Sequence, residues 1–256
     1  MRKNVLCTAI VLISAAVTVY AAHRIYQEHS EYREGVDSYS VLETYIKEPQ
    51  TEPIPEESKP EQDEMSENAI TWPVVDFVAL KSINSDCVAW IRIDGTEIDY
   101  PVVQGHDNSF YLKHLFGGEW NGAGCIFLDS HVEPDLSDRH SVLYGHHMKN
   151  GTMFSDIADY KDQTYYENHA TGMILTPTEN YRIEFFAGYV AGADDENAWK
   201  VTFATEDEYV DWLNETVGRS WFNSEVIPTA EDRVITLSTC SYEFNNDRFV
   251  LIGRLK

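Results

Sequence analysis

The run Val234-Ile-Thr-Leu-Ser-Thr-Cys240 is followed, after a loop at 241–247, by Arg248-Phe-Val-Leu-Ile-Gly-Arg254. Both runs are rich in β-branched and aromatic residues, so we predict a β-hairpin with a long loop. Cys240 closes the first strand, and Arg248 opens the second. If the strands pair there, the two residues face each other with Cβ atoms about 5 Å apart. A guanidinium would then lie beside the sulfur or beside the group that the sulfur attacks.

The alternation of side chains along the first strand bears on the chemistry of Cys240. It places Thr236, Ser238 and Cys240 on one face and Ile235 and Leu237 on the other. A free cysteine is usually a small buried hydrophobe. A strand-end position beside hydroxyl groups and an arginine instead favours a reactive thiol, because reactive cysteines lie in electropositive, partly exposed surroundings.

The preceding sequence alternates short strands with a few helices. We predict strands at 88–93, 98–103, 124–128, 141–144, 172–175 and 181–190, and helices near 74–81 and 205–216. Pro101 places the second strand at a sheet edge or a bulge, because proline cannot donate to a ladder. The pattern predicts a mostly β fold, a closed antiparallel barrel with an N-terminal helix and a few short helices.

Composition limits the function classes. The formal net charge of −24 argues against nucleic acid as a partner, because phosphate recognition needs basic patches. The four cysteines, Cys7, Cys87, Cys125 and Cys240, are too few and too scattered for a disulfide framework or a zinc site. We expect Cys87 and Cys125 to be core thiols, and a bridge between them stays open because sequence does not give their geometry.

The N-terminus carries a long apolar segment. Arg2 and Lys3 precede an uncharged run at 5–22, which as a helix spans about 27 Å and matches a bilayer core. We expect a retained single transmembrane anchor, with residues 1–4 inside and the rest of the chain outside the cell. A cleaved signal peptide is the alternative.

A spacer then separates this segment from the predicted catalytic domain. Residues 23–65 form a juxtamembrane segment, with a weak helical stripe at 39–46, and a linker rich in proline and glutamate. A linker with so few apolar residues cannot form a core. The folded domain is predicted at 66–256.

A second candidate for chemistry lies in Val142-Leu-Tyr-Gly-His-His-Met-Lys-Asn-Gly-Thr-Met-Phe154. A free thiol is only about 3% ionised at pH 7, so a cysteine nucleophile needs a base or a positive neighbour. A histidine can take the proton and later return it to a leaving amine. The His146-His147 pair does not predict a metal site, because no third ligand falls at a recognised spacing. The residues alone do not distinguish His146 from His147.

The segment Thr236-Leu-Ser-Thr-Cys240 with Arg248, together with the histidine segment, resembles the sortases, the cysteine transpeptidases of Gram-positive cell surfaces, and class B in particular. The resemblance runs from about Asn84 to the C-terminus. It implies a sortase-type barrel, no cofactor, and catalytic roles for Cys240, His146 and Arg248. Arg248 would stabilise an oxyanion or hold the substrate backbone.

The resemblance also implies substrate contacts and a reaction. Asn108 and Leu112 would line the substrate groove, and Ser238 and Thr239 would contact the substrate. The substrate would be a surface protein with a C-terminal sorting motif of the Asn-Pro-Gln-Thr-Asn or Leu-Pro-x-Thr-Gly type, cleaved after threonine. An amine of a peptidoglycan precursor or of a pilin lysine would resolve the thioacyl enzyme.

Two other functions remain open. With water as the acceptor, the same residues would make a secreted cysteine peptidase. From a different class, the chain could be a noncatalytic, anchored surface-binding module. Papain-type enzymes place the cysteine before the histidine, the reverse of His146 and Cys240.

Overall fold

The structure is a computed structural model that describes residues 2–48, 71–192, 194–240 and 247–256, without the side chains of residues 2–10 and Cys240. The α-helices are α1 (Arg2–Leu42), α2 (Phe77–Ile83), α3 (Gln163–Asn168) and α4 (Glu206–Arg219). Short 3-10 helices are η1 (Glu43–Tyr45), η2 (Phe110–Leu112), η3 (Ser155–Lys161) and η4 (Glu196–Trp199). The strands are β1 (Ile46–Lys47), β2 (Val74–Val75), β3 (Cys87–Arg92), β4 (Asp99–Val103), β5 (Ile126–Leu128), β6 (His140–Gly145), β7 (Thr171–Leu175), β8 (Asn180–Ala191), β9 (Arg233–Cys240) and β10 (Arg248–Leu255).

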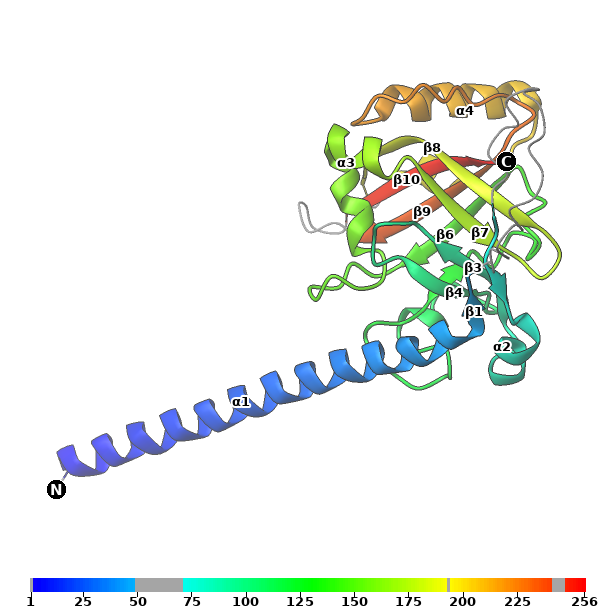
Figure 1. Ribbon diagram of the computed structural model, residues 1–256. Coiled ribbons are helices and arrows are strands. Elements are labelled where there is room, and N and C mark those ends of the chain that lie inside the picture. Colours follow the sequence, from blue (N-terminus) through cyan, green and yellow to red (C-terminus); the bar gives the residue numbers. More distant parts are fainter. Residues whose placement is uncertain (1, 49–70, 193, 241–246) are drawn as a thin grey trace, which may run out of the picture.

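Eight strands close a barrel in the order β10-β8-β7-β3-β4-β5-β6-β9, with β9 paired back to β10 (Figure 1). The predicted closed barrel is confirmed. The prediction that it is antiparallel is wrong, because β4 with β5 and β6 with β9 are parallel. The long connections at 104–125 and 146–232 account for the difference, since parallel neighbours need a crossover that returns the chain to the starting end.

Strand β4 lies inside the sheet although it contains Pro101. It pairs with β3 on one side and with β5 on the other, so the edge alternative of the prediction is wrong. The ladder with β3 has a register shift between Cys87 and Ala89. The ladder with β5 begins at Val102, one residue after the proline. Pro101 therefore lies beyond the end of that ladder, where its missing N–H interrupts no pair with β5.

The hairpin β9–β10 has apolar residues on both faces. Ile235 and Leu237 belong to the main core inside the barrel. Val234 and Val250 belong to a second apolar cluster on the outer face, which α4 covers with Tyr209, Trp212 and Leu213. Figure 1 shows α4 lying across this side of the barrel. The outer face of β9 is thus a covered surface and not a solvent-exposed one.

Helix α1 projects from the barrel toward the N-terminus (Figure 1). Among the residues that the structure describes, no helix is both long and apolar enough to cross a membrane. The predicted membrane segment at 5–22 lies partly outside this description, because it includes residues whose side chains are not described. The proline-rich linker, from residue 49 onward, lies outside it as well.

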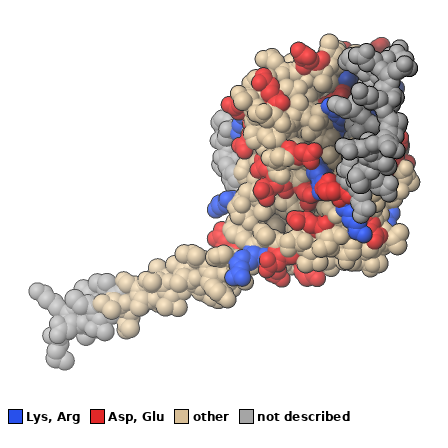
Figure 2. All heavy atoms as spheres, viewed as in Figure 1, with Lys and Arg blue, Asp and Glu red and all other residues tan. Residues whose placement is uncertain are grey.

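The C-terminal part of α1 packs on the barrel. Tyr39 and Leu42 are buried in the main core, and Ile46 of β1 pairs with Val75 of β2. The weak apolar stripe noted in the sequence is therefore the surface that attaches this helix to the barrel. Acidic side chains are spread over much of the face seen in Figure 2, in keeping with the net charge of −24.

His140 at the start of β6 predicts a loss of stability at acidic pH. Its ring is buried, with Nδ1 at 2.8 Å from the Lys200 carbonyl and Nε2 at 2.7 Å from Thr236 Oγ1. Burial lowers the pKa of His140 to about 4, although the hydrogen bond to Lys200 opposes it. Because the unfolded chain takes up the proton near its ordinary pKa of about 6.5, stability is lost as the pH falls from about 6.5 to about 4.

Urea unfolding of the wild type and of His140→Gln, which does not titrate, measures this effect. Between about pH 7 and pH 4 the wild type should lose about 3 kcal/mol more than the variant. The difference isolates His140 from carboxylates that titrate in both proteins. Parallel losses would show that the buried ring does not govern acid stability.

Candidate active site

The mouth of the β9–β10 hairpin brings two predicted residues face to face. Cys240 pairs with Arg248 at the end of the ladder, and Arg248 also pairs with Ala191 of β8. The predicted hairpin and its register are confirmed. The predicted loop that joins the strands lies, apart from Asp247, outside the described residues.

Strand β6 brings the histidine segment beside Cys240. β6 and β9 are parallel and pair Gly145 with Thr239. The next residue after each of these is His146 and Cys240, respectively. Neighbouring strands lie about 4.8 Å apart. The backbones of Cys240, His146 and Arg248 therefore meet at one end of three adjacent strands.

The ring of His146 is held by a backbone carbonyl. Nε2 lies 2.7 Å from the carbonyl oxygen of Leu112. A carbonyl only accepts, so Nε2 carries the proton and Nδ1 is the basic nitrogen of the neutral ring. The sequence predicted Leu112 as a substrate contact, and the structure gives its backbone a role in orienting the histidine.

The glycine before His146 allows a close approach of two core side chains. A Cβ on Gly145 would lie 2.5 Å from Ile126 Cδ1 and 2.7 Å from Phe154 Cδ2. Phe154 also donates its backbone N–H to the His146 carbonyl at 2.9 Å. The turn from β6 into the histidine loop is therefore fixed by packing on one side and by a hydrogen bond on the other.

His147 has different surroundings from those of His146. Its backbone forms an isolated bridge with Met153. Burial lowers its pKa, and the charge of Asp159 opposes that effect. The backbone bridge ties His147 to Met153, at the far end of the histidine loop.

Asp129, directly after β5, is a buried carboxylate that sequence reasoning missed. Its Oδ2 accepts from Asn108 Nδ2 and from the Tyr144 hydroxyl, both at 2.9 Å. Its Oδ1 accepts from the backbone N–H of His131 at 2.9 Å and lies 2.8 Å from Nδ1 of the same residue. Burial acts to raise the pKa of Asp129, but the hydrogen bonds from His131 and Tyr144 outweigh it and hold the pKa low. An ionised Asp129 therefore fixes Asn108 and Tyr144 together.

Asn108 and Tyr144 connect Asp129 with the predicted groove and with the surroundings of Arg248. The other end of the Asn108 amide accepts from the backbone N–H of Ser130 at 2.8 Å, so both ends of the amide are oriented. Burial and Asp129 raise the pKa of Tyr144, and the nearby charge of Arg248 opposes them. Asp129 thus links a predicted groove residue with the neighbourhood of Arg248.

We expect Asp129→Asn to weaken substrate binding more than turnover. Asparagine keeps one acceptor oxygen where the carboxylate has two, so its NH2 group must face either the backbone N–H of His131 or the pair of donors from Asn108 and Tyr144. In either arrangement a donor faces a donor, so the support that orients Asn108 should be weakened. With a sorting peptide, KM should rise about tenfold while kcat changes by less than about threefold. Asp211→Asn on the exposed side of α4 is the control. An unchanged KM would show that Asn108 is positioned without Asp129.

Ser238 and Thr239 are both fully buried, although the sequence predicted substrate contacts for them. Trp199 of η4 donates from Nε1 to Ser238 Oγ at 3.0 Å. Substrate contact by Ser238 therefore requires movement of Trp199. The Ser238 hydroxyl is thus paired with an indole from η4, a residue to which no role was assigned from the sequence.

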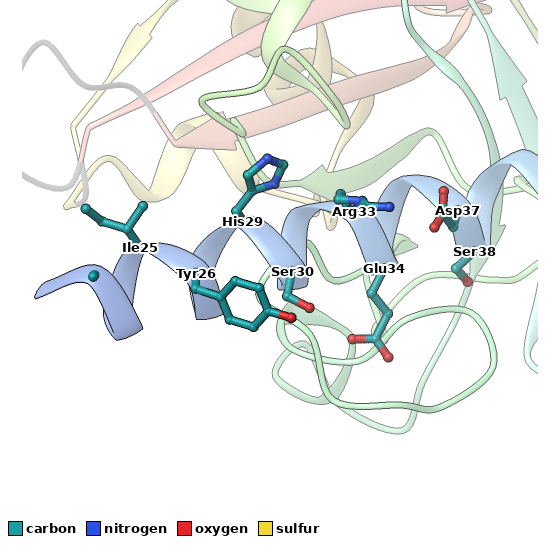
Figure 3. A pocket seen from close by; sticks show the side chains of 9 residues that line it. Ile25, Tyr26, His29, Ser30, Arg33, Glu34, Asp37 and Ser38 are labelled. Carbon is teal, nitrogen blue, oxygen red and sulfur yellow. The ribbon is translucent and has the colours of Figure 1, made fainter. Parts of the chain in front are cut away.

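A separate hollow lies on α1, away from these residues. It is lined by nine residues, all from α1: Ala22, Ile25, Tyr26, His29, Ser30, Arg33, Glu34, Asp37 and Ser38 (Figure 3). None of the predicted site residues belongs to it. Within the described ranges, no group of three His, Cys, Asp or Glu side chains is placed to hold a metal ion.

Comparison with known proteins agrees with the site geometry. A family model described as the sortase domain matches residues 91–256. The chain belongs to the sortase family. Sortase B of Staphylococcus aureus is 32% identical over 219 residues, which cover 85% of this chain and 89% of that protein. Sortase B of Listeria monocytogenes is 36% identical over 178 residues, which cover 69% of this chain and 72% of that protein.

Solved structures of sortase B also resemble this sortase. The S. aureus sortase B–substrate complex matches with a TM-score of 0.67 and 35% identity, over 70% of this chain and 84% of that chain. Another structure of sortase B is a complex with triglycine. This sortase is therefore of class B and, like its family, a cysteine transpeptidase.

Proposed function

We propose that this sortase cleaves a C-terminal sorting motif of a surface protein after threonine, through a thioacyl intermediate on Cys240. The amine acceptor is a peptidoglycan precursor or a pilin lysine. The observation that supports these residue roles is the strand register, which places Cys240 between His146, directly after β6, and Arg248 on β10. The motif is of the Asn-Pro-Gln-Thr-Asn or Leu-Pro-x-Thr-Gly type.

In the first half-reaction, the sulfur of Cys240 adds to the threonyl carbonyl carbon. Nδ1 of His146, basic because Nε2 is bonded to Leu112, takes the thiol proton. The carbonyl oxygen becomes an oxyanion, and the guanidinium of Arg248 stabilises it or holds the adjacent peptide backbone. When the C–N bond breaks, the His146 imidazolium gives the proton to the departing amine.

In the second half-reaction, an amine attacks the thioester. His146 takes a proton from the attacking nitrogen, the C–S bond breaks, and Cys240 leaves as the thiolate. The His146 imidazolium then returns the proton to the sulfur, which restores the starting thiol and neutral ring. The sortase B complex with triglycine supports an amine acceptor, because triglycine carries a free amino group. An acidic surface (Figure 2) also favours the approach of a cationic amine.

Asn108 and the side chain of Leu112 are proposed to line the groove for the sorting motif. Both are half-buried, and Asn108 is pre-oriented by Asp129 and Ser130. Ser238 and Thr239 are proposed to act at the threonine once Trp199 has moved. The existence of a substrate complex for S. aureus sortase B supports a groove of this kind.

Arg248→Lys should be poorly active, because lysine keeps the charge but loses the planar fork of donors. We expect kcat to fall at least about tenfold, since one oxyanion donor contributes a factor of about 100 or more. Arg254→Lys, on the same strand but paired with Glu184, is the matched control and should keep normal kcat. A near-normal kcat for Arg248→Lys would mean that charge alone is sufficient.

We also propose that residues 5–22 anchor the enzyme in the cell membrane, with the barrel outside. The support is the sequence alone, an uncharged run after Arg2 and Lys3. Membrane fractionation of cells that express the full chain should place it in the membrane pellet. Release of a protein that starts after residue 22 would instead indicate a cleaved signal peptide.

A peptide-library cleavage screen with candidate amines, read by mass spectrometry, tests the proposed substrate and acceptor. The expected product is a peptide cut after threonine and joined to an added amine. Products that carry only water would identify a peptidase, and no turnover with any motif would favour a noncatalytic binding module.

A further inference from the structure

We propose that Tyr39 of helix α1 is a positioning residue for His146, so that the N-terminal helix is part of the scaffold of the catalytic site. This inference rests on the proposed role of His146. Tyr39 precedes the matched sortase domain at 91–256, yet its side chain is buried in the barrel core. Two chains of contacts lead from this side chain to His146.

The first chain reaches the imidazole. The Tyr39 hydroxyl donates to the Gly124 carbonyl at 2.5 Å. Gly124 packs so closely on the next segment that a Cβ would lie 2.5 Å from the Tyr111 carbonyl and 2.9 Å from the Leu112 carbonyl. Leu112 is the residue whose carbonyl holds Nε2 of His146 at 2.7 Å. A shift of Gly124 would therefore move the group that sets the tautomer of the histidine.

The second chain reaches the backbone of the histidine loop. The ring of Tyr39 packs edge-on against Tyr100, with centroids 5.2 Å apart at 84°. The Tyr100 hydroxyl accepts from the backbone N–H of Met153 at 3.1 Å. Met153 has a φ of +61°, an uncommon conformation for a residue with a side chain. The next residue, Phe154, donates to the His146 carbonyl at 2.9 Å.

Further contacts fix α1 relative to both chains. Glu31 accepts from the backbone N–H of Gly122 at 2.6 Å, and its carbonyl accepts from Asn121 Nδ2 at 3.0 Å. A small cavity of about 100 Å³ separates α1 from the histidine loop, and Tyr39 and Met153 both line it. The described part of α1 before these contacts is exposed at residues 11–30 and extends away from the barrel (Figure 1). The helix is therefore held where it passes the two loops that flank His146.

Tyr39→Phe in the full-length chain tests the proposal, because it removes the hydroxyl and keeps the ring in the core. Tyr100→Phe cuts the second chain in the same way. For each variant we expect kcat to fall about tenfold with KM within about twofold, since misplacement of a catalytic group acts on turnover. The pH profile of kcat should shift as well, which a purely structural role would not cause. Tyr26→Phe, on the exposed part of α1, is the control.

Nitrogen NMR of the His146 ring provides a second readout that does not require turnover. In the wild type the neutral ring should carry its proton on Nε2, and Tyr39→Phe should reduce the population of that tautomer. A variant with a lower melting temperature but unchanged kcat, pH profile and ring signals would overturn the proposal. If the wild type cleaves no sorting motif, the proposed function fails, and the ring signals still decide whether Tyr39 positions His146.

Discussion

Cys240→Ala is expected to reduce transpeptidation of a sorting peptide at least about a thousandfold, because alanine cannot form the thioacyl intermediate. The fold should be kept, since the substitution lies at the last residue of β9. Initial rates with a fluorogenic peptide measure the loss, and circular dichroism checks the fold. Undiminished turnover by a folded variant would remove Cys240 from the mechanism.

Labelling of the wild-type thiols provides an internal control for this prediction. Cys87 and Cys125 are buried, and burial raises the pKa of each to about 12, so both should react slowly with iodoacetamide at neutral pH. Cys240 should be labelled much faster than either. If Cys240 reacts no faster than these core thiols, the chain would be a noncatalytic module.

His146→Ala should lose a factor of about 100 to 10,000 in kcat, the usual contribution of a general acid–base group. His147→Ala should lose less than about threefold, because His146, and not His147, is the residue whose ring the Leu112 carbonyl orients beside the end of β9. The two variants are a matched pair, since they remove the same side chain at neighbouring positions. Steady-state rates at neutral pH, measured with the same peptide, provide the comparison.

The opposite ranking would transfer the role of base to His147. Equal and large losses in both variants would indicate that the loop has collapsed, and the melting temperatures would show this directly. Equal and small losses would mean that a group other than these histidines accepts the thiol proton.

Local patterns in the sequence predicted the parts of the fold that depend on neighbouring residues. The alternation of β9 and the long loop before Arg248 were sufficient for the hairpin and its register, because a hairpin pairs strands that are close in sequence. The strands and the two predicted helices are present with ends shifted by up to three residues. The hairpin pattern alone therefore indicated that Cys240 and Arg248 meet at its mouth.

Contacts between distant segments were less predictable. Nothing local specifies that β6 runs parallel to β9, so the antiparallel barrel was a wrong expectation. Asp129 carries no motif, and its importance comes from Asn108 and Tyr144, which lie on other segments. Trp199 and Tyr39 likewise act on residues far along the chain. The resemblance to sortases supplied the identity of His146, which residue spacing alone could not.

The most direct measurement for the central claim is the mass of the enzyme during a single turnover that is quenched with acid. With a cleavable sorting peptide and no added amine, the quenched enzyme should carry the peptide up to its threonine, joined to Cys240. Peptide mapping should place the adduct on that residue, and adding an amine before the quench should remove it. Cleavage of the peptide without any adduct on Cys240 would contradict the proposed mechanism.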